Sequence, residues 1–428
     1  MTALHRRRAG PAPAGAAGTG SAGPTAAGAA PGGAAPGGAA RGGAARGGAA
    51  PGGSPREGLA PLPWRAIVRA TILGVVLMLA LVARDVGRNN GGNFLSVVQP
   101  GARGPSAEVI RRDFPGVRLP ADVGLDGQMT YSIARNPLHP AAVAPALDRP
   151  QYRLRRPLLS LAGWALHPTG GGMGLVWALL AVGVAMVVVG ALATGVLGAT
   201  FGQRPWLAAV FPLLPGAYWS VRVTVADAMA LALALGAIAL ALRRRPVAAV
   251  AVAVLAVLAK EPAVLVFAGW ALWRRDRRSA AMVAVPAAVA LAWALALRSL
   301  VPAGASGPGE ISLVPFAGLV QATTDLWLRG RELVGMASSI AALSCGVVAV
   351  ARRRGHPLWW AIVVQLGFTS IMSSNVIGMN FGGTRSTMPL LLLSLVALAT
   401  RRRTLPDAGE PATDGRGRAL DAAAPVPG

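Results

Sequence analysis

Long apolar runs separated by short polar connections fill most of the chain between residues 66 and 400. Each run is typical of a helix buried in a lipid bilayer. Ten runs can be distinguished, covering residues 66–83, 173–198, 206–219, 228–242, 246–259, 263–273, 279–297, 335–351, 358–374 and 386–400. Several are shorter than the roughly 20 residues that a membrane-spanning helix needs. The number of spans therefore requires a second, independent signal.

The arginines provide this signal, because they alternate between the connections. Every second connection is basic: Arg204, 243–245, 274–278, 352–354 and 401–403. The short connections between them carry only single charges. Cytoplasmic loops of membrane proteins are enriched in lysine and arginine. The alternation thus predicts about ten transmembrane helices, with both chain termini in the cytoplasm.

Three segments complete this organisation. Residues 1–64 are rich in Ala, Gly and Pro and predict a disordered cytoplasmic tail, and residues 404–428 predict a second one. Residues 65–403 form the predicted transmembrane domain. Its first outer loop, 84–172, is far longer than the other connections.

Composition agrees with a polytopic membrane protein surrounded by membrane lipids. Of 428 residues, 54% are hydrophobic and 14% are charged, whereas a soluble domain has about 25% charged residues. The net charge of +24 comes largely from the topological arginine clusters, so we expect no nucleic-acid partner. The single cysteine excludes an internal disulfide. The bias towards Ala, Arg, Gly and Pro indicates a bacterial genome, and hence the bacterial cytoplasmic membrane.

The stretch "AVLAKEPAVLVF", 256–267, contains Lys260, the only lysine of the chain. A single helix over 246–273 would place Lys260 and Glu261 at the middle of the bilayer, which is costly. Pro262 favours a break, because the residue before a proline is driven out of the helical region. We therefore predict a helical hairpin with arms of about 21 Å and a recessed, charged tip.

A second polar stretch, "GLDGQMTYSIARNP", 124–137, lies in the long loop and places Asp126 just before a helix-like run. The aspartate could cap this helix. It could equally face a cavity and act as a general base towards a hydroxyl group. The residues alone leave both interpretations open.

The order of these blocks resembles the GT-C superfamily of bacterial integral-membrane glycosyltransferases, which use polyprenyl-phosphate sugars. The resemblance rests on the blocks 126–137, 152–164, 214–235, 257–267 and 380–393. It implies an all-α, GT-C-like fold of about ten transmembrane helices with a long first outer loop. It also implies transfer of a sugar from a polyprenyl-phosphate donor to an acceptor on the outer face of the membrane.

The resemblance implies an aspartate as the base, and two aspartates compete for this role. Asp126 stands in the loop motif. Asp85 closely follows the first helix, as the acidic residue does in many members of the superfamily. We favour Asp126 for its surrounding pattern, and the same motif adds Gln128 and Tyr131 as candidate substrate-binding residues.

Cations would then hold the donor phosphate. Lys260 and Arg385 are the main candidates, with Arg153 or Arg156 from the loop block "YRLRRP". Lys260 could instead form an ion pair with Glu261, and the loop arginines Arg153, Arg155 and Arg156 could anchor the chain to anionic lipids. Glu261, Arg222 and Asp227 complete the candidate substrate-binding residues, although Arg222 and Asp227 could instead pair with each other.

No cofactor can be derived from the sequence. Many members of the superfamily use a divalent cation, but the chain shows no metal-ligand spacing. Two rival functions remain open at this stage. A transporter or flippase of a lipid-linked substrate should show inverted repeats, and none is visible. A non-catalytic scaffold with the same fold would differ only in lacking activity.

Overall fold

The computed structural model describes residues 61–202, 204–304 and 309–400. The predicted tails therefore lie almost entirely outside the described residues. Within the described ranges all regular elements are helices, and the only β-type pairing is an isolated bridge between Ile311 and Met372. This confirms the predicted all-helical class.

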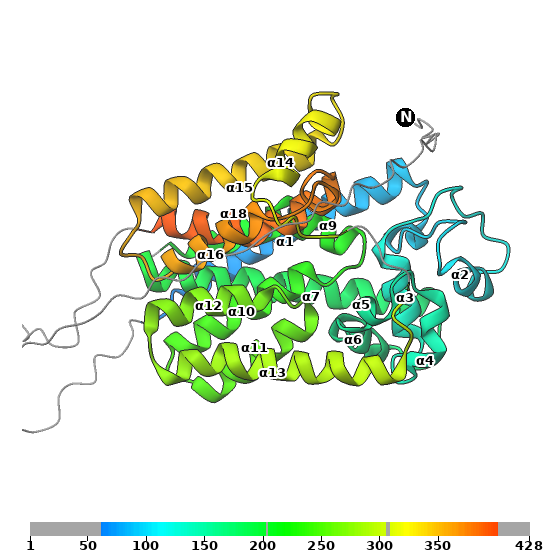
Figure 1. Ribbon diagram of the computed structural model, residues 1–428, viewed down its shortest axis with the longest axis horizontal. Coiled ribbons are helices and arrows are strands. Elements are labelled where there is room, and N and C mark those ends of the chain that lie inside the picture. Colours follow the sequence, from blue (N-terminus) through cyan, green and yellow to red (C-terminus); the bar gives the residue numbers. More distant parts are fainter. Residues whose placement is uncertain (1–60, 203, 305–308, 401–428) are drawn as a thin grey trace, which may run out of the picture. The chain divides into compact units, whose positions relative to one another are not determined.

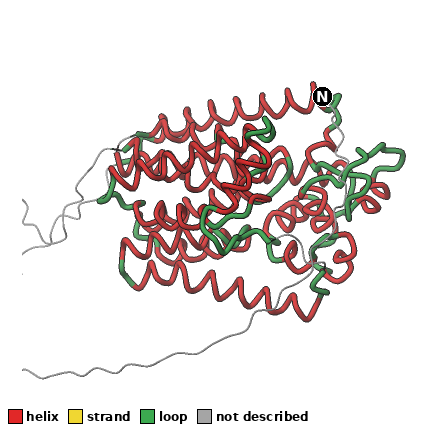
Figure 2. The backbone as a smooth tube through the Cα atoms, turned by 45° about the horizontal axis from the view of Figure 1, so that its top comes forward, coloured by secondary structure: helices red, strands yellow, loops and turns green. Residues whose placement is uncertain are grey.

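Five helices are long and apolar enough to cross a bilayer, which indicates an integral membrane protein. They are α1 (Trp64–Asn89), α7 (Met173–Gly202), α13 (Arg277–Leu300), α15 (Leu333–Arg352) and α18 (Asn380–Ala399). Many of their large apolar side chains are exposed, as on α1 at Ile72, Leu73 and Val76. A soluble protein rarely exposes such a continuous apolar surface. Figure 2 shows the long helices running beside one another, with much of the loop structure gathered at one end.

Three shorter apolar helices follow α7: α10 (Asp227–Leu242), α11 (Pro246–Ala259) and α12 (Ala263–Arg274). The two other predicted segments are interrupted. Residues 205–222 form the short pieces η3 (Pro205–Ala209), α8 (Val210–Leu213) and α9 (Pro215–Arg222). Leu214 is extended, with ψ 133°, as expected for a residue that precedes a proline. The other segment, residues 358–374, forms α16 (Trp359–Ser370), which ends early. The short helix α17 (Ser374–Ile377) begins at the last residue of the predicted segment.

The predicted break after residue 259 is confirmed. Helix α11 ends at Ala259, Lys260 is extended (φ −161°, ψ 125°), and α12 begins at Ala263. Helix α12 runs back towards the basic connections, as shown by its contact with α16, which begins shortly after the basic residues 352–354. Gly269 lies directly against Ala361 near the start of α16. Helices α11 and α12 therefore form a hairpin whose tip holds Lys260, Glu261 and Pro262.

The arginine clusters gather at one end of the helices, which we call the arginine end (Arg204, 243–245, 274–278 and 352–354). Ile67, Val196 and Ala208 share one apolar cluster there with Ala239, near the end of α10. The ring of His356 contacts Phe201, and its Nε2 lies 3.0 Å from the Thr400 hydroxyl. Cluster 243–245 follows α10, and cluster 352–354 ends α15. The basic connections between helices thus lie at the same end, in agreement with the arginine alternation.

The predicted outer loop folds into a helical layer at the opposite end, which we call the site end (Figure 1). Its elements are η1 (Phe94–Val97), α2 (Ala107–Asp113), α3 (Asp126–Arg135), α4 (Pro140–Val143), η2 (Ala144–Ala146), α5 (Pro150–Leu154) and α6 (Leu158–Leu166). Met129 and Ile133 of α3 pack with Leu297 and Val301 at the end of α13. A second segment at this end holds α14 (Ala317–Ala322) and the π-turn η4 (Thr323–Trp327).

Candidate functional site

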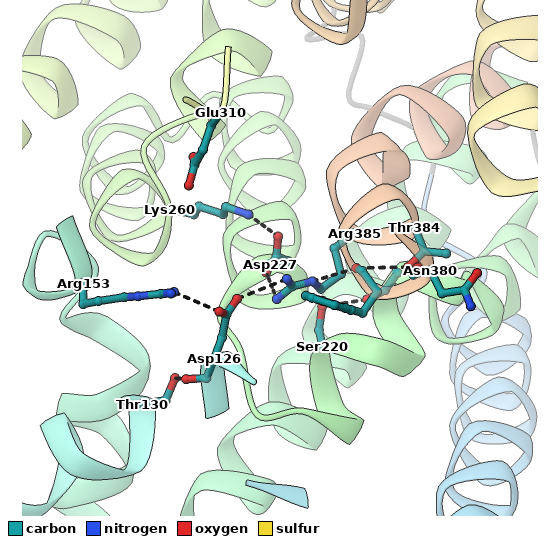
Figure 3. Close-up of polar contacts among 12 residues, drawn as sticks. Asp126, Thr130, Arg153, Ser220, Asp227, Lys260, Glu310, Asn380, Thr384 and Arg385 are labelled. Carbon is teal, nitrogen blue, oxygen red and sulfur yellow. Dashed lines mark hydrogen bonds and ion pairs between the residues drawn. The ribbon is translucent and has the colours of Figure 1, made fainter. Parts of the chain in front are cut away.

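Five charged side chains from five parts of the chain meet at the site end (Figure 3). Arg385 of α18 lies between two carboxylates, with its Nη2 3.2 Å from Asp126 Oδ2 and its Nη1 3.4 Å from Asp227 Oδ2. Arg153 of α5 donates to Asp126 Oδ1 at 3.0 Å. Lys260 Nζ donates to Asp227 Oδ1. Two aspartates and three cations thus form one continuous ion-pair network.

Glycines allow the elements of this network to approach each other. Gly127 follows Asp126, and a side chain there would collide with the backbone oxygens of Val98 and Val223. Helix α3 can therefore begin directly against the turn that leads to Asp227. Gly383 has the same role at the start of α18, where any Cβ would collide with the carbonyl oxygen of Ile377.

The network sets the charge of Asp126. Its side chain is 30% exposed. Burial raises the pKa of the Asp126 carboxyl, but the positive charges of Arg385 and Arg153 outweigh burial and hold this pKa well below its ordinary value. Asp126 is therefore a fully ionised carboxylate at neutral pH, and a weak base while both arginines stay in place.

A second group of charges borders the first. Arg156 Nε donates to Glu261 Oε2 at 2.7 Å, and Arg149 Nη2 lies 3.3 Å from Glu310 Oε1. The ring of Tyr152 lies beneath Arg149 and Arg156, whose guanidinium carbons are 4.2 and 4.3 Å from its centroid. Burial raises the pKa of the Tyr152 hydroxyl to about 12. This aromatic ring stacks with the arginines and remains neutral.

Two cavities adjoin these charges. The larger encloses about 300 Å³ between α10, α12, α16 and α18, and the smaller encloses about 60 Å³ beside Asp126. Both are lined by Arg156, Asp227, Lys260 and Arg385. The larger cavity has a charged part and an apolar part, the latter including Leu231, Val266, Phe368 and Met372. The smaller is lined mainly from α3, α5 and α6. The charged side chains therefore form a shared wall between the larger amphipathic chamber and a small chamber beside Asp126.

The structure brings most of the predicted site residues together. Asp126, Arg153, Arg156, Asp227, Lys260, Glu261 and Arg385 all line at least one cavity. Gln128 and Tyr131 do not. Gln128 is 1% exposed and donates to the Val123 carbonyl. The buried Tyr131 donates its hydroxyl to Asp113 at 2.7 Å. These two residues hold the loop layer together.

Two pairings considered from the sequence are wrong. Lys260 pairs with Asp227 and not with its neighbour Glu261, because the extended backbone at Lys260 sends successive side chains to opposite sides. Arg222 does not pair with Asp227. Instead its Nε donates to Asp85, and its Nη1 donates to the Ser96 carbonyl at 2.7 Å. Asp126 forms ion pairs, and no side-chain cap was found at the start of α3.

Three charged residues of this region were not predicted from the sequence, namely Arg149, Asp148 and Glu310, whereas Arg155 belongs to the loop block considered as a phosphate clamp. Arg155 and Glu310 line the larger cavity, and Asp148 binds Arg153 at 2.8 Å. The sequence signal for Arg155 is its place in "YRLRRP". Asp148 and Glu310 have no local signal, because their partners are fixed only by the fold. Across the described part of the chain, no group of three or more His, Cys, Asp or Glu residues could hold a metal ion.

Comparison with known proteins adds no identification. No protein-family model matches the chain, and neither a curated protein nor a solved structure matches it.

Proposed function

We propose that the chain is a GT-C-like glycosyltransferase of the bacterial cytoplasmic membrane, with about ten spans and both termini in the cytoplasm. It would transfer a sugar from a polyprenyl-phosphate donor to an acceptor on the outer face. The observation that carries the proposal is the shared charged wall, with an amphipathic chamber on one side and Asp126 in a small chamber on the other. A lipid phosphate needs both apolar walls and cations, and the larger cavity offers both.

The chemistry divides between the two chambers. The acceptor hydroxyl oxygen attacks the anomeric carbon of the sugar, and the bond between this carbon and the phosphate oxygen breaks. The lipid phosphate leaves with the bonding electrons and is stabilised by nearby cations such as Arg385 and Lys260. The hydroxyl proton passes to the Asp126 carboxylate.

The ion pairs link donor binding to the strength of the base. Arg385 and Arg153 hold the pKa of Asp126 low in the empty protein. A donor phosphate in the larger cavity competes for Arg385. As the arginine turns towards the phosphate, Asp126 loses part of its positive surroundings and becomes a stronger base. Donor binding would therefore precede deprotonation of the acceptor.

The test is the variant Asp126→Asn, assayed in membranes supplied with a panel of radiolabelled polyprenyl-phosphate sugars. We expect transfer of label from lipid to acceptor to fall roughly 100- to 10,000-fold, as for loss of a general base. Asp85→Asn is the matched control and should retain transfer per folded molecule. Normal turnover by Asp126→Asn would reject Asp126 as the base. Movement of an unaltered lipid-linked sugar across the membrane, without transfer, would favour the transporter instead.

A further inference from the structure

One of the cations that line the two cavities has no carboxylate partner. Four carboxylates line the cavities, and each is paired with at least one cation. They are Asp126 with Arg153 and Arg385, Asp227 with Lys260 and Arg385, Glu261 with Arg156, and Glu310 with Arg149. Every cavity-lining cation except Arg155 takes part in these pairs. Among the described residues, no carboxylate lies within 4.0 Å of Arg155.

The position of Arg155 makes this excess charge significant. It directly follows the last residue of α5, precedes Arg156, and lines the larger cavity together with Lys260 and Arg385. Its side chain is partly buried, and its Nε is buried without a hydrogen-bond partner. Buried polar groups are almost always hydrogen-bonded. Arg155 therefore adds a positive charge without a carboxylate partner to the wall of the larger cavity, and such a charge is suited to binding an anion.

We propose that Arg155 is the primary binding residue for the phosphate of an anionic lipid in the larger cavity. The proposal rests on the proposed function, in which Arg385 and Lys260 stabilise the phosphate, and it makes Arg155 the first residue to bind that phosphate. Lys260 and Arg385 must give up an aspartate to bind an anion, whereas Arg155 gives up nothing. The planar guanidinium can also offer two parallel N–H donors to phosphate oxygens. Arg155 would thus bind first, and Arg385 and Lys260 would join as their pairs with the aspartates open.

The apolar part of the cavity indicates that the phosphate is borne by a lipid. Leu231, Val266, Phe368 and Met372 line the same space as Arg155. Free phosphate would gain nothing from these walls, while a prenyl chain would bury apolar surface against them. The two sources of phosphate are therefore distinguishable by experiment.

Binding to the purified full-length protein in detergent provides the test, with farnesyl phosphate, farnesol and inorganic phosphate as probes. We expect the wild type to bind farnesyl phosphate much more tightly than either other probe. Arg155→Gln should weaken farnesyl phosphate binding roughly tenfold to a hundredfold, the effect of losing a charged hydrogen bond, and should leave farnesol binding unchanged. Arg118→Gln, at an exposed arginine of the same loop, is the matched control and should bind as the wild type.

The other outcomes separate the inference from the function on which it rests. If Arg155→Gln binds farnesyl phosphate as tightly as the wild type does, Arg155 is not the binding residue, although a lipid-phosphate site still exists. If the wild type does not prefer farnesyl phosphate, the proposed donor class itself is wrong. Equal binding of inorganic phosphate would show that the site takes a free anion. If Arg155→Gln does not fold, Arg155→Lys replaces it and should weaken binding several-fold through loss of the paired donors.

Discussion

Two of the aspartate–arginine clusters at the site end differ in how each arginine is paired. In the first, Asp85 of α1 pairs with Arg222 of α9, whose side chain is 2% exposed. Arg222 has one other partner, the carbonyl oxygen of Ser96. Neither residue lines either of the two cavities described above. This pair joins the first helix to the interrupted segment and lies apart from the two cavities.

The cluster around Asp126 is connected differently. Arg385 has a second carboxylate in Asp227, and Arg153 has one in Asp148. Either arginine can therefore leave Asp126 without becoming an unpaired buried charge. The shared ion pairs around Asp126 therefore allow its arginines to rearrange, whereas the single buried pair of Asp85 and Arg222 holds two helices together. The choice between Asp85 and Asp126 as the base, open from the sequence, is decided in favour of Asp126 in our proposal for this reason.

The largest expected difference between the clusters is in stability. Asp85→Asn leaves buried Arg222 without its carboxylate, and breaking a buried pair in this way costs about 3 kcal/mol or more. Asp126→Asn leaves both arginines paired and should lower the free energy of unfolding by less than about 1 kcal/mol. Denaturant unfolding of the two variants in the same detergent measures the contrast. Equal destabilisation would remove the distinction between a fixed and a shared network.

A double-mutant cycle sharpens the assignment of partners within the Asp126 network. Lys260→Met and Asp227→Asn should show a coupling energy of about 1–3 kcal/mol, because the two side chains form an ion pair. The matched cycle of Lys260→Met with Glu261→Gln should be additive within about 0.5 kcal/mol, since Glu261 pairs with Arg156. Unfolding free energies give both couplings. A larger coupling energy for Lys260 with Glu261 than for Lys260 with Asp227 would show that Lys260 pairs with its sequence neighbour.

The smallest expected effect is a dependence on pH. The folded-state pKa of Asp126 is depressed, so its stabilising contribution is complete above the unfolded value of about 3.9 and declines as pH falls towards the folded value. The small stability difference between the wild type and Asp126→Asn should therefore shrink towards zero as the pH falls from 5 to 3. Unfolding midpoints measured across this range provide the check. A constant difference would mean that the arginines do not act on Asp126.

Much of the helical fold could be predicted because apolar runs and basic connections are local signals. The boundaries of α10, α11 and α12 lie within a few residues of the predicted segments. The interruptions at Leu214 and at 371–373 were not predicted, since apolar composition continues across them. Among the short helices of the 84–172 loop only α3 was predicted, as the helix-like run after Asp126, and the others were missed. They are too short for a clear periodicity and depend on packing against the long helices.

The candidate site could be predicted as a set of residues, but its pairings could not. Arg385 and Asp126 are 259 positions apart, and Arg385 and Asp227 are 158 apart. No local pattern reports contacts over such separations. The nearest neighbours suggested Lys260 with Glu261, and the backbone geometry at the hairpin tip separates them. Sequence therefore identified the charged residues, while the fold determined which of them neutralise each other and left Arg155 as the excess charge.

The short hairpin also has a consequence for the surrounding bilayer. Helices α10, α11 and α12 contain 16, 14 and 12 residues, and so extend for about 24, 21 and 18 Å, against a hydrocarbon core of about 30 Å. In the proposed ten-span arrangement, lipid beside α11 and α12 would thin towards the hairpin tip, a case of hydrophobic mismatch. Thinner bilayers would expose the charged wall to the headgroup region, and thicker ones would submerge it. Access to the site would then depend on the acyl-chain length of the surrounding lipids.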